Sequence, residues 1–413
     1  MQRLLMSSCA ALLLCWSAAQ SVPAKPGELI DVIAEGTTGP FEIQRLATHL
    51  FGSHGPPVIE NSVETYRIRF SSKGLDGEPV AIYAQLFVPV MPAPAERPLY
   101  VFGSGTTGIA DICAPTQERA YPHPLGEYRA YLLAFAGRGF TAIIPDYLGF
   151  NDPSRYQSYF NAKAEAQVML DAVRAVEDFY RRQGAAGADR SVFLGGYSQG
   201  GHAAFAAADL RDSYAPELEI AGILGFGATT DVESLLREGP FYAPYIALSY
   251  RQDYGIERFD PSRLFEPRWL PLLDEVAGQV CVDQVQIRYP FAGRELYSEE
   301  FYMALFGFDL DDEFPRIAEV LEENHTGLSG HGLPALIAQG EDDVIVWTTT
   351  QNQFVRQLCE SGSKVHYLVY PGVRHRETRP VAFEESIAWM YSLAEGQPPP
   401  SSCPLLEERP AGN

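Results

Sequence analysis

Lysine is scarce in this chain of 413 residues: it occurs at four positions, and arginine supplies nearly all of the basic charge. The 31 basic residues are outnumbered by 53 acidic ones, which gives a formal net charge of -22. A surface of this sign repels phosphate backbones and anionic lipid headgroups. The charge balance therefore argues against a nucleic-acid partner and against an electrostatic membrane anchor.

Long hydrophobic runs are also missing: beyond the N-terminus, no segment approaches the roughly 18 apolar residues that a membrane span needs. Residues 1–19 combine one basic residue, Arg3, with a short apolar stretch and small residues at its end. These are the features of a secretory signal peptide. We predict cleavage after Ala19, with Ala18 and Ala24 as alternatives, and expect a secreted or periplasmic protein without a stable membrane anchor.

The sequence has no C-x-x-C pair, so its cysteines lack the spacing of a zinc site or a redox-active dithiol. Removal of residues 1–19 leaves four cysteines, an even number for an oxidising compartment. Three pairings are possible among Cys113, Cys281, Cys359 and Cys403. Cys359 ends a predicted helix and Cys403 lies in the proline-rich tail, where a crosslink would prevent fraying. Four buried free thiols are the alternative.

Motifs for metal and nucleotide binding are missing too. The chain contains no H-E-x-x-H, calcium-loop or P-loop pattern, so no metal or nucleotide cofactor is expected. Residues 103–108, GSGTTG, formally match the dinucleotide motif G-x-G-x-x-G. That site needs a helix directly after the motif, whereas Pro115, Pro122 and Pro124 follow here. The pattern is therefore not typical of a dinucleotide-binding oxidoreductase.

What the sequence does contain is an alternation of buried strands with helices, which predicts a mostly parallel sheet covered on both faces. The first two strands are joined by a turn-rich segment and predict an antiparallel hairpin. Strands are predicted at 65–70, 80–88, 98–102, 140–145, 191–194, 220–225, 333–338 and 365–370, and helices at 127–137, 163–182, 200–210, 349–359 and 380–393.

The stretch 231–330 breaks this alternation with several prolines and short helical pieces. We interpret it as an inserted, mainly helical cap. The core would then consist of two parts, residues 20–230 and residues 331–413.

The strongest chemical signal is Gly-Tyr-Ser-Gln-Gly at 196–200, which fits G-x-S-x-G. A predicted strand leads into it and a predicted helix follows, so Ser198 would lie on a sharp strand-to-helix turn. Such a serine is a nucleophile, and the N–H of the next residue, Gln199, would donate to the oxyanion formed on attack. A serine nucleophile also needs a base and an acid that orients the base.

The acid and the base are predicted on the loops after the last two strands. Three acids follow strand 333–338, and the position of Asp343 best allows a carboxylate to turn in, with Asp342 as the alternative. His375 follows strand 365–370 and could reach both Asp343 and Ser198. His202, one helical turn after Ser198, is instead expected to pack against the sheet. The second oxyanion donor should follow the third strand, and Thr106, through its N–H and its hydroxyl, is the candidate.

These motifs resemble the secretory lipases, the lipase A-like family of the α/β-hydrolase superfamily. The resemblance rests on GSGTTGIADICAP, PDYLGF, LDAVRAVEDF, GYSQGGHAAFAAADL and SYAPEL. It implies an α/β-hydrolase fold, hydrolysis of triacylglycerols or simpler esters, no cofactor, and a cap before the strand that carries the acid. It also implies the disulfides Cys113–Cys281 and Cys359–Cys403. One departure is Ser104, which stands where relatives often carry histidine.

Two questions remain open from the sequence. The cap is rich in aromatic residues, which could line an acyl tunnel or form the cap's own core: Phe241, Tyr242, Tyr245, Tyr250, Tyr289, Phe291, Tyr297, Phe301, Tyr302, Phe306 and Phe308. A serine peptidase of the same fold, acting on short or proline-containing peptides, is the alternative to an esterase. It would hold the substrate's amino terminus with clustered acids, for which the cap offers Glu299, Glu300, Asp309, Asp311, Asp312 and Glu313.

Overall fold

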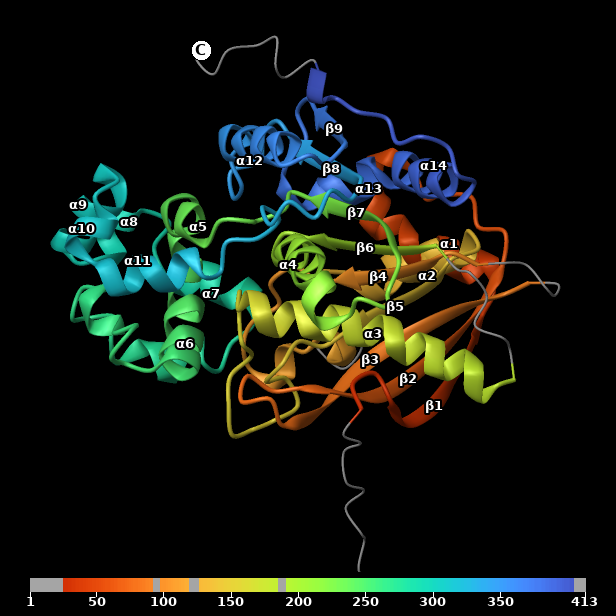
Figure 1. Cartoon of the computed structure of the whole chain (residues 1–413). Coiled ribbons are helices and arrows are strands. Elements are labelled where there is room, and N and C mark those ends of the chain that lie inside the picture. The colour runs from red at the N-terminus through yellow and green to blue at the C-terminus, as the bar shows by residue number, and fades with distance from the viewer. Residues whose placement is uncertain (1–24, 92–96, 119–125, 185–190, 405–413) are drawn as a thin grey trace, which may run out of the picture.

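The computed structural model describes residues 25–91, 97–118, 126–184 and 191–404. The predicted signal peptide lies outside the described residues. In this part of the chain, nine strands form one sheet in the order β1-β2-β3-β5-β4-β6-β7-β8-β9 (Figure 1).

One edge of the sheet is antiparallel. β1 (Leu29–Thr38) pairs with β2 (Ser62–Lys73), and β2 pairs with β3 (Pro79–Val90), which forms the predicted hairpin. β3 then runs antiparallel to β5 (Thr141–Pro145). The sequence patterns assigned no element to β1 or to the helix after it, α1 (Pro40–Phe51).

The rest of the sheet is parallel, as the alternation of strands and helices predicted. Because parallel strands end at the same edge, the loops that follow them meet there. Besides β5, the strands concerned are β4 (Leu99–Gly103), β6 (Val192–Tyr197), β7 (Ile220–Phe226), β8 (Ala335–Gly340) and β9 (Val365–Tyr370).

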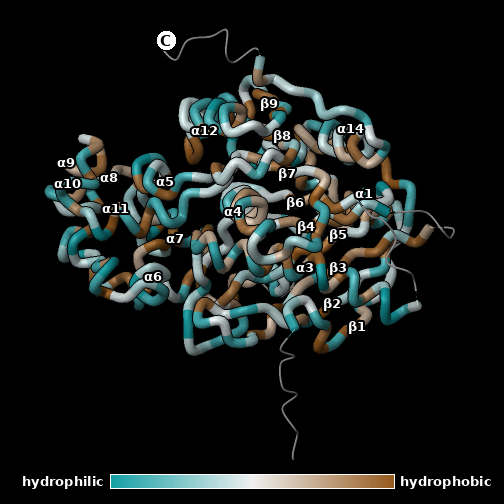
Figure 2. Tube along the Cα trace, viewed as in Figure 1, coloured by the Kyte–Doolittle hydropathy of each residue, from teal (hydrophilic) through white to brown (hydrophobic). Residues whose placement is uncertain are grey.

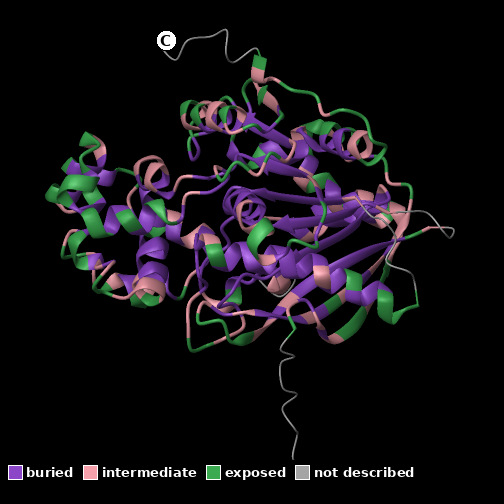
Figure 3. Cartoon of the chain, viewed as in Figure 1, coloured by how far each residue is buried: buried purple, intermediate pink, exposed green. Residues whose placement is uncertain are grey.

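Helices cover both faces of the sheet, whose central strands are largely apolar (Figure 2) and buried (Figure 3). Side chains alternate between the faces along each strand: in β4, Leu99 and Val101 join one core cluster, and Tyr100 and Phe102 join the other. The first cluster includes residues of α3 (Ala162–Arg182), α4 (Gln199–Tyr214) and α12 (Thr348–Glu360). The second includes residues of α1, α2 (Tyr128–Gly137) and α14 (Phe383–Ala394).

The connection from β7 to β8 forms a separate group of short helices at one end of the sheet, coloured green to cyan in Figure 1. Most of its buried side chains form a third core cluster. Ile345 and Val346, from the loop after β8, also belong to this cluster. The helices are α5 (Val232–Glu238), α6 (Ala243–Tyr254), α7 (Val282–Arg288), α8 (Gly293–Leu296), α9 (Glu299–Gly307), α10 (Leu310–Glu313) and α11 (Pro315–Glu322).

The C-terminal helix differs from its prediction. Instead of one helix over 380–393, the structure has α13 (Thr378–Val381) and α14, with Ala382 between them. The structure also contains the two disulfides that the family resemblance implied, Cys113–Cys281 and Cys359–Cys403.

Candidate active site

Ser198 lies at the turn between β6 and α4. Its backbone has φ 54° and ψ -115°, a conformation that residues with a side chain rarely adopt. The Ser198 N–H donates to the carbonyl oxygen of Phe226 at 3.0 Å, which holds the turn against β7. Ser198 therefore lies between a strand and a helix, the context in which a G-x-S-x-G motif indicates a nucleophile.

Three glycines let β4, β6 and α4 approach one another around this turn. A Cβ atom on Gly200 would lie 1.9 Å from the carbonyl oxygen of Gly103, and one on Gly196 would lie 2.0 Å from the carbonyl carbon of Gly200. Backbone atoms cannot move away cheaply from such overlaps, so a side chain at either position would displace the turn.

Asp343 and His375 form a hydrogen-bonded pair. Asp343 Oδ2 lies 2.7 Å from His375 Nδ1, and both residues are buried. The other carboxylate oxygen of Asp343 accepts from the backbone N–H groups of Ile345 and Val346 at 2.8 and 2.9 Å. These bonds fix the direction of the carboxylate and hence the orientation of the ring. The alternative acid, Asp342, is exposed.

Ser198 and His375 line the same cavity, which has a volume of about 190 Å³. The second ring nitrogen of His375, Nε2, is buried and makes no hydrogen bond to any described residue. It is therefore the ring atom that could take a proton from a nucleophile. The described residues that line the cavity are Thr106, Gly126, Tyr128, Tyr197, Ser198, Tyr242, Val282, Gln286, Ile345, His375, Arg376 and Arg379.

The two oxyanion candidates differ in how they are held. Thr106 lines the cavity, but its hydroxyl is hydrogen-bonded to the Tyr159 hydroxyl at 2.7 Å, which leaves its N–H as the group to consider. Gln199 is the first residue of α4, where backbone N–H groups have no acceptor within the helix. The Gln199 side chain is buried, and its Nε2 donates to Glu165 Oε1 at 2.7 Å.

The His202 ring bridges α3 and the segment after α11. Nδ1 lies 2.6 Å from Glu165 Oε2, and Nε2 lies 2.8 Å from the backbone oxygen of Asn324. Glu165 and His202 are fully buried. Sequence reasoning missed Glu165, whose link to Gln199 joins α3 to the residue after the nucleophile.

Most of the aromatic residues considered in 231–330 belong to the third core cluster, which the connection from β7 to β8 forms. Of the eleven considered, Tyr242 lines the cavity that contains Ser198. Phe291 and Phe308 are exposed, at 65% and 75%. The fully packed members are Phe241, Tyr242, Tyr245, Tyr250, Tyr289, Tyr297 and Phe301.

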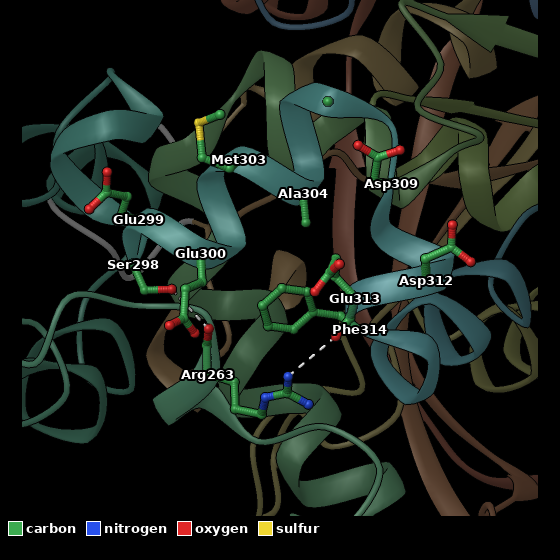
Figure 4. Close-up of a pocket in the computed structure, with 11 residues that line it drawn as sticks. Arg263, Ser298, Glu299, Glu300, Met303, Ala304, Asp309, Asp312, Glu313 and Phe314 are labelled. Atoms are coloured by element: carbon green, nitrogen blue, oxygen red, sulfur yellow. Dashed lines mark hydrogen bonds between the residues drawn. The ribbon is translucent and has the colours of Figure 1, made fainter.

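The acidic residues of the cap line a different space. An open groove of about 930 Å³ lies along α9 and α10 and shares no lining residue with the Ser198 cavity (Figure 4). Five of the six candidate acids line it: Glu299, Glu300, Asp309, Asp312 and Glu313. These acids are therefore not arranged to hold a substrate's amino terminus beside Ser198.

The described residues contain no cluster of three or more His, Cys, Asp or Glu side chains that could hold a metal ion. Within the same residues, none of the helices is both long and apolar enough to cross a membrane.

Comparison with known proteins gives a consistent result. The chain is similar to “Lipase A” of Moesziomyces aphidis, with 24% identity over 83% of this chain and 75% of the relative. It is 25% identical to the “Probable trichothecene esterase SAT6” of Stachybotrys chartarum, over 81% of this chain and 70% of that protein. The crystal structure of Candida antarctica lipase A has a similar fold, with a TM-score of 0.68, 20% identity, and coverage of 92% of this chain and 84% of that one.

The fold class predicted from the sequence is thus confirmed as that of the lipase α/β-hydrolases. The model of the family described as “Secretory lipase” matches residues 129–402, a range that contains Ser198, Asp343 and His375. Since the match covers well over half of the sequence, the chain belongs to the secretory lipase family, and it is a carboxylic ester hydrolase.

Proposed function

We propose that Ser198, His375 and Asp343 form the catalytic triad with which this protein hydrolyses carboxylic esters. The observation that carries the proposal is the buried hydrogen bond from His375 to Asp343, in a cavity that Ser198 also lines. In this assignment Ser198 is the nucleophile and His375 the general base. Asp343 holds the histidine ring in the required tautomer.

The reaction would proceed through an acyl-enzyme. Ser198 Oγ attacks the ester carbonyl carbon while His375 Nε2 takes the hydroxyl proton. The N–H groups of Gln199 and Thr106 would stabilise the oxyanion of the tetrahedral intermediate. Collapse of the intermediate breaks the bond to the alcohol, which receives the proton from His375. Water, deprotonated by the same histidine, then releases the acid and regenerates Ser198.

We assign residues 231–330 as a cap on a core made of residues 20–230 and 331–413. Tyr242, Val282 and Gln286 of this segment line the cavity beside Ser198, which supports a role in substrate binding. The peptidase alternative is not favoured, because the described lining residues include two arginines but no Asp or Glu. A cavity of this charge would repel a protonated amino terminus.

We further propose that residues 1–19 are a signal peptide and that the mature protein is exported. Membership of a secretory family supports this. N-terminal sequencing of the protein recovered from the medium or periplasm should give Gln20 as the first residue. A first residue of Met1 would refute the proposal.

The triad is tested by Ser198→Ala. The variant should lose at least about 1,000-fold in the rate of p-nitrophenyl ester hydrolysis, because triad members act as a unit. It should also lose covalent labelling by a fluorophosphonate. Ser213→Ala, at the far end of the same helix, is the matched control and should behave like the wild type. Labelling that persisted in Ser198→Ala would contradict the assignment.

A further inference from the structure

The cavity beside Ser198 has a charge opposite to that of the molecule. The protein carries a formal net charge of -22, yet the described lining includes Arg376 and Arg379 and no carboxylate. The acid of the proposed triad, Asp343, lies behind His375 and is already engaged in three hydrogen bonds. A small basic cavity in an acidic protein points to a ligand with a negative charge.

Arg379 is a buried cation that forms no ion pair with an acid among the described residues. Its residue is 2% exposed, and Nη2 donates to the backbone oxygen of Gly126 at 2.8 Å. Nε and Nη1 are buried and have no hydrogen-bond partner among the residues that the structure describes. Isolated charges are costly to bury. A ligand anion in the adjoining cavity would supply the missing opposite charge.

The surroundings of Arg379 compensate its charge only in part. The guanidinium carbon lies 4.9, 5.3 and 4.6 Å from the ring centres of Tyr128, Tyr131 and Tyr197, which are cation–π contacts. The charge of Arg379 also acts on Glu118. The Glu118 carboxylate already accepts hydrogen bonds from the backbone N–H groups of Tyr128 and Arg129, and burial raises its pKa.

Arg376 complements Arg379 because it is exposed. It follows His375 directly in the chain and lines the cavity. An exposed guanidinium can move to meet a ligand and form paired N–H bonds to a carboxylate. Arg376 is therefore the residue that would contact an anion. Arg379, whose guanidinium is buried, would attract the anion electrostatically from within the cavity wall, where the dielectric constant is low.

We infer that the cavity selects compact esters that carry an anionic group, in particular a carboxylate. This rests on the proposed function, because the cavity is defined by the proposed nucleophile. The volume of about 190 Å³ supports a compact ligand, since drug-sized ligands occupy pockets of roughly 300–1,000 Å³. Gln286 and Tyr242 make part of the lining polar, and Gln286 Nε2 donates to the Tyr242 hydroxyl at 3.1 Å.

The anion could belong to the acid or to the alcohol of the ester, so the test has two arms. The first compares mono-p-nitrophenyl glutarate with neutral p-nitrophenyl valerate. The second compares 4-carboxyphenyl butyrate with phenyl butyrate. In at least one arm the wild type should prefer the anionic ester, and Arg376→Gln should reduce this preference, measured as the ratio of kcat/KM values, by about tenfold. The preference should also weaken in high salt.

The matched control is Arg288→Gln. It removes the same charge from the exposed end of α7, the helix that supplies Val282 and Gln286, but Arg288 does not line the cavity. It should leave the ratio unchanged. Arg376→Lys should retain part of the preference.

Equal rates on anionic and neutral esters in both arms would overturn the inference, as would a preference that Arg376→Gln leaves intact. Either result would leave the proposed function standing, provided that Ser198→Ala still abolished hydrolysis. Hydrolysis that survives in Ser198→Ala would instead refute the triad.

Discussion

At the scale of single residues, Gly227 shows how tightly the His375–Asp343 pair is enclosed. Gly227 has φ +50°, and a Cβ atom there would lie 2.9 Å from His375 Nδ1 and 3.1 Å from Asp343 Oδ2. Both atoms belong to the hydrogen bond that orients the proposed base. Glycine is therefore required by space as well as by backbone conformation.

We predict that Gly227→Ala lowers kcat by at least about 100-fold, because the methyl group would push the ring out of line with its acid. Gly255→Ala is the control. Gly255 also has a positive φ, +80°, but a Cβ atom there has no neighbour within 4 Å. Both variants place a side chain at a positive φ, so steady-state kinetics and urea unfolding separate the effect of the contact from that of the backbone conformation. Equal losses of activity would show that the strain, not the contact, matters.

The residues that sequence reasoning identified and those that it missed differ in kind. Ser198 could be predicted because its motif is local, and His375 because it follows a predicted strand. Gly227, Glu165 and Arg379 could not be predicted. Their surroundings are set by packing between segments far apart in the chain, such as the 34 residues between Glu165 and Gln199. No local pattern encodes such a contact.

At the scale of elements, the proposed cap is attached to the rest of the chain where α5 ends. Glu238, the last residue of α5, accepts hydrogen bonds from the N–H of Trp347, at 2.8 Å, and from the hydroxyl of Thr350. Trp347 is the N-cap residue of α12, the helix that follows the Asp343 loop. The Glu238 carboxylate therefore accepts from one of the backbone N–H groups that have no acceptor within the helix at its start. Burial raises the pKa of Glu238 from 4.5 to about 7.

This shift makes a pH-dependent contribution to stability. The folded protein retains a proton on Glu238 between pH 4.5 and about 7, whereas the unfolded chain has released it. The contribution is therefore complete below pH 4.5 and is lost as the pH rises through about 7. The unfolding free energy of the wild type should therefore decline between pH 4.5 and 8. We predict that Glu238→Gln removes up to about 3 kcal/mol of this decline. Urea unfolding at both pH values measures it.

Glu233→Gln, a change of the same type on the same helix, is the control and should leave the pH dependence as in the wild type. If both variants gave the same pH profile, the burial of Glu238 would not be the source of the effect.

The elements that the sequence did not predict also have physical explanations. β1 is an edge strand with Leu29 as its one buried residue, so it lacks the apolar alternation of a half-buried strand. α1 buries Ile43, Ala47 and Phe51 at four-residue spacing, a helical signal that was available in the sequence but was not used. The predicted helix 380–393 has the right location, but its interruption at Ala382 could not be read from periodicity.

At the scale of the whole molecule, the two disulfides connect different parts of the chain. Cys113–Cys281 joins the loop after β4 to the start of α7. Beside it, the N–H of Val282 donates to the carbonyl oxygen of Thr107 at 2.9 Å. This crosslink therefore holds the cap against the loop that carries Thr106. Cys359–Cys403 instead attaches the C-terminal tail to the end of α12, away from the cavity lining.

Removing each disulfide should consequently have a different effect. The sequence separations are 168 and 44 residues. Since the loss of unfolded-state entropy grows with loop length, Cys113–Cys281 should stabilise the fold by about 1 kcal/mol more. The Cys113→Ala/Cys281→Ala variant should lose the stabilisation that its crosslink provides. Because Val282 and Thr106 line the cavity, it should also lose at least about tenfold in kcat/KM. Cys359→Ala/Cys403→Ala should lose stability but keep its activity below the unfolding transition. Urea unfolding and ester kinetics on both double variants test this, and equal loss of activity in both would show that the cap is not held through the Thr106 loop.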